Sequence, residues 1–171
     1  YFVAGAVFSG FAMVQTLVLI MRKVMNLENY MTRKHIEYMN IVILVTGGMV
    51  AVAYLSEFYM AWYSQNPYED YMYLSVNVSQ GPYWWAFWSL MICNIAAPQF
   101  FWIPRIRRSF AWTFVIAIII NIGMWFERFM IIVTCLHRDY VPSSWTMFYP
   151  TYVDIGIFVG TLGIFFTLFL L

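Results

Sequence analysis

Four ionisable side chains lie inside long apolar stretches of this 171-residue chain, where a charge is costly unless it is paired or functional. They are Glu57, Glu127, Arg128 and Asp154. Because Glu127 and Arg128 are sequence neighbours, their side chains would point about 100° apart on a helix and cannot simply neutralise each other. We therefore expect Arg128 to pair with an acid from another helix, and Glu57 and Asp154 are the leading candidates.

An amide and a proline form a second unusual pair. Pro98 has no N–H group, so the carbonyl of Asn94, four residues earlier, would lose its helical donor. A kink with a free carbonyl and an amide side chain could bind water or a polar group of a substrate. Such prolines are more often structural, because neighbouring groups satisfy the freed backbone. The pair therefore favours a structural role.

The remaining candidate ligands exclude several classes of site. His35 precedes the apolar run 39–62 and His137 follows the run 110–136, which places them at opposite faces of the membrane. They therefore cannot be the two axial ligands of one haem. The two cysteines, Cys93 and Cys135, are too few for a disulfide scaffold or a cysteine-based metal site. A net charge of +1 argues against a nucleic-acid partner. We expect this chain itself to hold no metal or other cofactor.

The elements that must position these residues are membrane helices. Hydrophobic residues make up 63% of the chain, charged residues 10%, and the mean hydropathy is +0.72. A membrane helix needs about 20 mainly apolar residues, and five runs are long enough. The sequence predicts an all-α, polytopic membrane bundle, since a β-barrel would show short alternating strands instead. The five predicted helices cover about 1–21, 39–62, 82–103, 110–136 and 151–171.

The orientation follows from the basic residues in the loops. Seven of them fall in the 22–38 and 104–109 loops, whereas the 63–81 and 137–150 loops hold only Arg138. Since cytoplasmic loops carry the excess of Lys and Arg, the first two loops are predicted to be cytoplasmic and the other two periplasmic. Glu57, Glu127, Arg128 and Asp154 then lie in the outer third of the bundle. Two interpretations remain open: a proton or quinone-headgroup site that opens outward, or a buried ion pair that orients helices.

Several strings resemble one family. They are residues 1–12 (YFVAGAVFSGFA), 57–63 (EFYMAWY), 81–85 (GPYWW), 121–131 (NIGMWFERFMI) and 142–145 (PSSW). Together they resemble the membrane subunits of the NrfD/polysulfide-reductase family, most closely those of bacterial alternative complex III. The resemblance runs through essentially the whole chain, and the string around Glu127 and Arg128 is its most specific part.

The resemblance implies the second half of a subunit with eight to ten helices, in a bacterial inner membrane. Such a subunit holds no cofactor and binds quinol, such as menaquinol, near the outer face. Electrons pass to an iron–sulfur subunit docked there, and then to haem c in a c-type cytochrome, among other membrane subunits. The first bundle forms most of the quinol pocket in this family, and polar residues of the second are proposed to move protons. Glu127 and Arg128 match the family's Glu-Arg position.

The candidate residues for a proton path or quinone site are Glu127, Arg128, Glu57, Asp154, His137 and Asn94. Two other functions remain open. A related subunit could serve as a scaffold or proton path without binding quinol, and polar groups in the missing first half would distinguish the two. Half of a secondary transporter is a weaker alternative, because transporter sites lie near the midplane and here only Asn94 is central.

Overall fold

The structure is a computed structural model that describes residues 2–71, 81–134, 137, 141, 143 and 145–170. The chain divides into two compact units, residues 1–131 and 132–171. Every element in the described part of the chain is helical. The predicted all-α fold is confirmed in these residues.

The first unit is built on three long apolar helices, α1 (Phe2–Val24), α2 (Arg33–Ser64) and α7 (Phe110–Phe129). Each is long and apolar enough to cross a membrane, and α7 continues as a π-helical segment, η5 (Met130–Thr134). Helix α2 is about 48 Å long at 1.5 Å per residue, so it extends beyond a hydrocarbon core of about 30 Å. A 3-10 turn, η1 (Leu27–Asn29), joins α1 to α2.

The predicted span 82–103 is helical but interrupted, as expected from the kink predicted at Asn94 and Pro98. It consists of α4 (Trp84–Met91), the π-helical turn η3 (Ile92–Ala96), α5 (Ala97–Gln99) and the 3-10 turn η4 (Phe100–Trp102). The cause is Pro98, whose missing N–H leaves the regular ladder incomplete. In its place the Ala97 N–H donates to the carbonyl of Ile92, five residues earlier.

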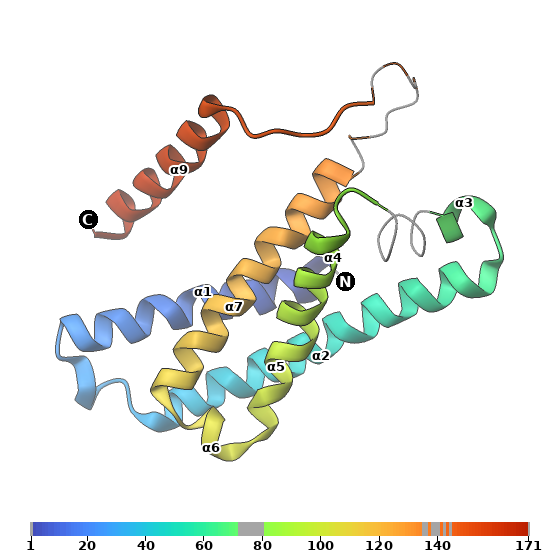
Figure 1. The fold of residues 1–171 in the computed structure, drawn as a ribbon. Coiled ribbons are helices and arrows are strands. Elements are labelled where there is room, and N and C mark those ends of the chain that lie inside the picture. The colour runs from blue at the N-terminus through green and yellow to red at the C-terminus, as the bar shows by residue number, and fades with distance from the viewer. Residues whose placement is uncertain are drawn as a thin grey trace. The chain divides into compact units, whose positions relative to one another are not determined.

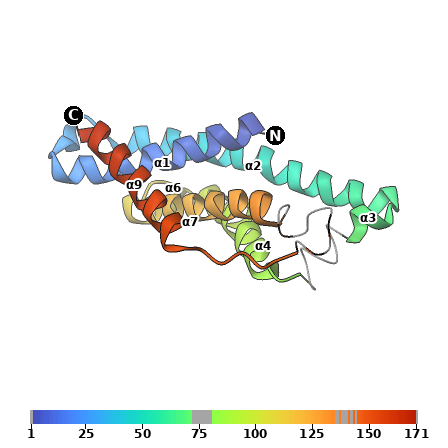
Figure 2. The same cartoon turned by 90° about the horizontal axis from the view of Figure 1, so that it is seen from above.

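The helices of the first unit form two layers. Helices α1 and α2 lie side by side in one layer, and the α4–α5 segment packs on α7 in the other (Figures 1 and 2). Large buried side chains between them include Phe8, Ile43, Val50, Phe101 and Ile120. Gly47 lets α1 and α5 approach α2, because a Cβ atom there would lie 3.0 Å from Phe8 and 3.1 Å from Pro98.

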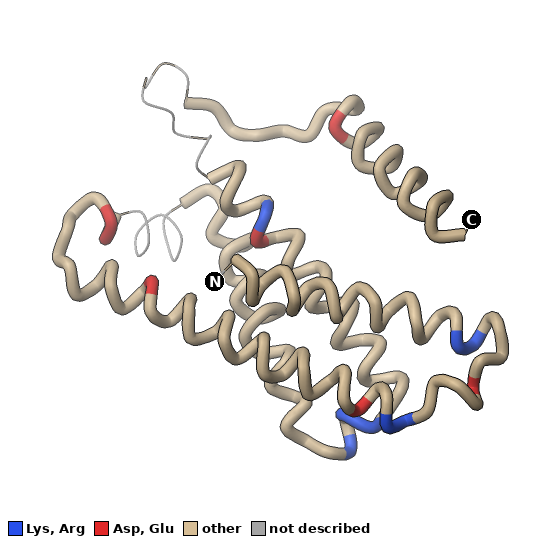
Figure 3. Tube along the Cα trace, turned by 180° about the vertical axis from the view of Figure 1, so that it is seen from behind, with Lys and Arg blue, Asp and Glu red and all other residues tan. Residues whose placement is uncertain are grey.

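The two ends of this unit differ in charge. Lys and Arg gather where α1 joins α2 and around the short helix α6 (Pro104–Arg107), as Figure 3 shows. Here Arg107 and Arg108 both pair with Glu37, at N–O distances of 3.1 and 3.0 Å. The short helix α3 (Pro67–Asp70) follows α2 at the other end and carries two acids. This separation matches the charge asymmetry from which the orientation is predicted.

The second unit contains one long helix, α9 (Tyr152–Leu170), which is also long and apolar enough to span a membrane. Four helices of the described residues therefore meet this criterion. Helix α9 begins with a reciprocal cap: Asp154 Oδ2 accepts from the Thr151 N–H at 2.8 Å and from its hydroxyl at 2.7 Å, and Thr151 Oγ1 accepts from the Asp154 N–H at 3.4 Å. That all five predicted spans form a single bundle stays a prediction.

Candidate functional site

Glu127 is the most deeply buried acid of the described residues, with 3% of its surface exposed. Helix α7 carries it inward because Ile116, Ile120, Gly123 and Glu127 follow one another at helical spacing on its buried face. A buried carboxyl group needs hydrogen-bond donors, and Glu127 Oε2 has two. The position of Glu127 along its apolar run predicted that it lies within the membrane. The structure shows that its side chain is buried between helices.

The first donor is Tyr54, whose hydroxyl donates to Glu127 Oε2 at 2.7 Å. Tyr54 lies on α2 in an inward stripe with Gly47, Val50 and Ala51. Sequence reasoning missed this residue, although the helical spacing of that stripe could have placed the phenol inside the bundle. The bond has the ordinary length of a hydroxyl–carboxyl hydrogen bond and crosses from one layer of helices to the other.

The second donor is Asn94, which is fully buried in the π-helical turn η3. Its Nδ2 donates to Glu127 Oε2 at 3.3 Å and also lies 3.5 Å from the Met124 sulfur. The irregular turn caused by Pro98 therefore carries a functional candidate, a common place for π-helical turns. We call Tyr54, Asn94 and Glu127 the outer cluster.

Gly123 makes room for the outer cluster. A Cβ atom at this position would lie 2.5 Å from Cys93 Cβ and closer still to Asn94 Oδ1. That amide oxygen is buried and accepts no hydrogen bond in the described part of the chain. An unsatisfied buried acceptor is rare and often marks a bound water or a functional site.

The outer cluster surrounds one carboxyl group with uncharged donors. Both hydrogen-bond donors to Glu127, the Tyr54 phenol and the Asn94 amide, are neutral groups. No basic side chain of the described residues forms an ion pair with this carboxylate. The arrangement suits a carboxyl group that gains and loses a proton.

Arg128 differs from its prediction. Its guanidinium carbon lies 5.2 Å from the centre of the Phe2 ring, a cation–π contact, and it forms no ion pair with any described residue. Glu57, one expected partner, is exposed on α2. The expectation of an Arg128–Glu57 ion pair is therefore wrong, because the aromatic ring at the start of α1 takes the guanidinium.

Two further candidates lie in the second unit. The described hydrogen bonds of Asp154 are the local ones that cap α9, which gives this acid a structural role. Its pairing with Arg128 stays a prediction. His137 is half-buried, and residues 135–136 and 138–140 beside it lie outside the described residues. Its place in a proton path also stays a prediction.

A second cluster of buried polar side chains forms hydrogen bonds between α1, α2 and α7. Gln15 Nε2 donates to Asn40 Oδ1 at 2.7 Å, and Asn40 Nδ2 donates to the Thr113 hydroxyl at 2.9 Å and the Arg107 carbonyl at 2.8 Å. All three side chains of this inner cluster (Gln15, Asn40 and Thr113) are fully buried. The inner cluster contains no ionisable side chain, so hydrogen bonding between helices explains it.

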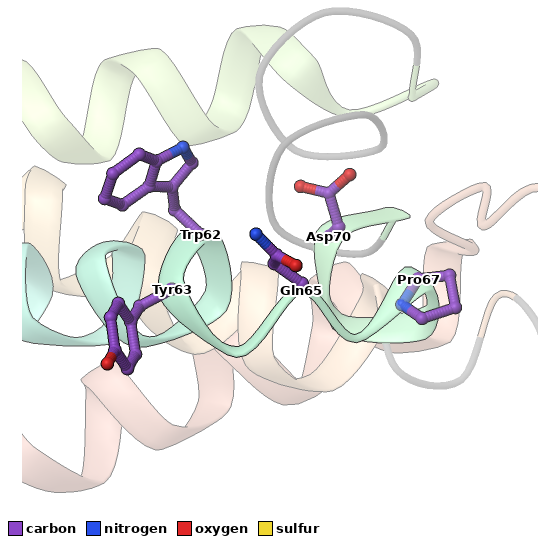
Figure 4. A pocket seen from close by; sticks show the side chains of 5 residues that line it. All are labelled: Trp62, Tyr63, Gln65, Pro67 and Asp70. Atoms are coloured by element: carbon purple, nitrogen blue, oxygen red, sulfur yellow. The ribbon is translucent and has the colours of Figure 1, made fainter.

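An open cavity of about 570 Å³ lies at the other end of α2. Its lining residues are Trp62, Tyr63, Gln65, Pro67 and Asp70. In Figure 4 the Asp70 carboxylate and the Gln65 amide face the same space, with the Trp62 indole beside them. This cavity was not predicted from the sequence. Gln65 shapes it by ending α2 in a left-handed conformation, with φ of 50°.

Metal chemistry was not expected from the sequence, and the described residues contain no group of three His, Cys, Asp or Glu side chains that could hold a metal ion. The absence of a cofactor in this chain stays a prediction.

Comparison with protein-family models gives one match. Residues 1–138 match the family described as "Polysulphide reductase, NrfD". The matched range includes every residue of the outer and inner clusters. No curated protein matches the chain.

Proposed function

This chain belongs to the polysulphide reductase NrfD family, and we propose that it takes part in quinol oxidation near the outer face of the membrane. Members of the family are membrane subunits of quinone-interacting respiratory complexes, and they work with iron–sulfur subunits. The finer proposal is a subunit like that of alternative complex III. Menaquinol would be its substrate, and a c-type cytochrome would receive the electrons after the iron–sulfur subunit.

The observation that carries the proposal is the outer cluster. Oxidation of one quinol to quinone releases two electrons and two protons. The electrons need an acceptor outside this chain, and the docked iron–sulfur subunit supplies it. We assign one proton to water at the outer face and the other to a base within the membrane, for which Glu127 is the buried carboxyl group among the described residues of the first unit. We assign it the role of accepting that proton and passing it on.

Tyr54 and Asn94 hold the Glu127 carboxyl group in place for this role. Their donors converge on Oε2, at 2.7 and 3.3 Å, whereas Oε1 accepts no hydrogen bond from the described residues. A proton can therefore reach Oε1 without breaking either bond. Tyr54 also extends the polar path from α7 to α2, since a phenol both donates and accepts.

The test is quinol oxidation by the complete, purified complex with Glu127→Gln. Glutamine keeps the size and an acceptor oxygen but cannot take a proton. We expect assembly to be retained and turnover to fall about tenfold or more, since a positioned general base typically contributes about a hundredfold or more. Glu69→Gln, an exposed acid on α3, is the matched control. Normal turnover with Glu127→Gln would contradict the proposal and favour the scaffold alternative.

A further inference from the structure

Two arginines converge on one aromatic ring at the inner end of the first unit. The guanidinium carbon of Arg22 lies 4.2 Å from the centre of the Phe110 ring, and that of Arg33 lies 5.8 Å from it. The three residues come from α1, α2 and α7. Two like charges held around one ring repel each other unless an anion lies between or beside them.

The chain supplies little negative charge at this place. Arg22 Nε donates to the Met31 carbonyl at 3.0 Å, and its Nη1 lies 3.6 Å from Glu28 Oε1, but Glu28 is 66% exposed, so this ion pair contributes little negative charge. Arg33 forms no hydrogen bond or ion pair with the described residues. The neighbouring acid Glu37 is already shared by Arg107 and Arg108. A net positive charge therefore remains around Phe110.

Two helix N-termini at the same place also favour a bound anion. Arg33 is the first residue of α2 and Phe110 is the first residue of α7. Neither N-cap residue, Thr32 or Ser109, caps its helix with a side-chain hydrogen bond. Free N–H groups and the positive ends of two helix dipoles thus adjoin the two guanidinium groups. Such a combination is suited to an anionic, phosphate-like group.

The apolar side chains around the two arginines suit the phosphate group of a lipid. Exposed apolar side chains continue from the arginines along α1 and α7, among them Ile20, Trp112 and Val115. Exposed tryptophans such as Trp112 are typical of the headgroup level of a membrane. A free anion would not need this apolar continuation, whereas the acyl chains of a phospholipid would lie along it.

We propose that Arg22, Arg33 and the N-terminus of α7 bind the phosphate of an anionic phospholipid in the inner leaflet. The guanidinium groups contact the phosphate oxygens, and Phe110 holds both groups in place from below. Basic sites between membrane helices on the cytoplasmic side are suited to such headgroups. This inference is independent of the proposed role of Glu127.

Native mass spectrometry of the purified complex, titrated with phosphatidylglycerol, tests the proposal. Arg33→Gln is the main variant, because the described contact of Arg33 is the long cation–π contact with Phe110, and Arg33 forms no hydrogen bond or ion pair with the described residues. We expect it to weaken phosphatidylglycerol binding about fivefold, the factor for one basic residue near an anionic surface. Lys34→Gln is the control: it removes the same charge one residue later, and the cation–π contacts found with Phe110 in the described residues come from Arg22 and Arg33. Phosphatidylcholine should bind both variants and the unmodified protein equally.

The same titration separates the other possible occupants. Millimolar inorganic phosphate should not displace phosphatidylglycerol; displacement at equal concentration would identify a free-phosphate site and overturn the proposal. Cross-links from Lys23 or Lys34 to an acidic segment of another subunit, with no phosphatidylglycerol bound, would assign the surface to a protein and also overturn it. Equal loss of binding in Arg33→Gln and Lys34→Gln would show only a diffuse charge effect, which contradicts a defined site.

Discussion

Tyr54 on α2 donates a 2.7 Å hydrogen bond to Glu127 on α7, and the two residues are 73 positions apart in the sequence. Asn40 and Thr113, which share a 2.9 Å hydrogen bond, are also 73 positions apart. The two helices therefore run in one direction with a constant register, joined by polar side chains at two levels about 21 Å apart. The outer level contains an ionisable group and the inner level does not.

Removing the hydroxyl of Tyr54 should weaken both stability and activity. Tyr54→Phe leaves the Glu127 carboxyl group with one donor, and a hydrogen bond to a charged group contributes about 1.5–3 kcal/mol. We expect a lower thermal unfolding temperature of the purified complex and slower quinol oxidation. Tyr59→Phe, five residues later on the exposed side of α2, is the control. Equal behaviour of the two variants would argue against a role for the Tyr54 hydroxyl.

A methyl group at Gly123 should disturb the outer cluster. Because the added Cβ would collide with Asn94 Oδ1 and Cys93, Gly123→Ala is expected to lower the free energy of unfolding by about 1–3 kcal/mol. Gly48→Ala has no atom within 4 Å of its new Cβ and should stabilise α2 by up to about 1 kcal/mol. Thermal unfolding of the two variants in detergent measures the difference. A neutral Gly123→Ala would mean that Asn94 can move freely.

The inner cluster should matter for assembly but not for turnover. Asn40→Leu leaves the Gln15 amide and the Thr113 hydroxyl without their partner, and each unsatisfied buried group costs about 1–3 kcal/mol. We expect a reduced yield of assembled complex, with normal quinol oxidation per complex that does assemble. A large loss of turnover at normal yield would instead place the inner cluster in the proton path.

The orientation of the first unit can be tested directly. In a protein whose two cysteines are replaced, Asp70→Cys on α3 should react with a membrane-impermeant thiol reagent added from the periplasmic side. Lys34→Cys should react only when the reagent reaches the cytoplasmic side. The reason is the excess of basic residues in the 22–38 and 104–109 loops. Labelling of the Asp70 position only from the cytoplasm would reverse the predicted orientation.

The sequence was sufficient for the helical character of the described spans, whereas the depth of the acids in the membrane stays a prediction. Long apolar runs predict spans within a few residues, because hydrophobicity and length decide membrane insertion. The interruption at Asn94 was predicted from Pro98, but its form was not: a π-helical turn depends on how η3 packs against α7. Glu127 and Asn94 were both candidates, yet only the fold shows that they hydrogen-bond.

The partner of Arg128 could not be predicted from the sequence for a physical reason. Charge balance led to the expectation of an acid, and Glu57 had the right depth. The rotation of α2 decides the outcome, because it points Tyr54 inward and leaves Glu57 exposed. In the first unit, Arg128 makes a cation–π contact with Phe2 in place of the expected ion pair with Glu57. The position of a residue along a helix follows from its residue number. The residue that it contacts on a neighbouring helix depends on how the two helices pack.

The most direct test of the central claim follows the protonation of Glu127 itself. Infrared difference spectroscopy of the complete complex detects the C=O stretch of a protonated carboxyl group when quinol is added and oxidised. We predict a carboxylic-acid band that appears with quinol in the unmodified complex, shifts in Tyr54→Phe as a hydrogen bond is lost, and is absent in Glu127→Gln. The same band in assembled Glu127→Gln complexes, unchanged in position and size, would show that another group takes the proton and would contradict the proposal.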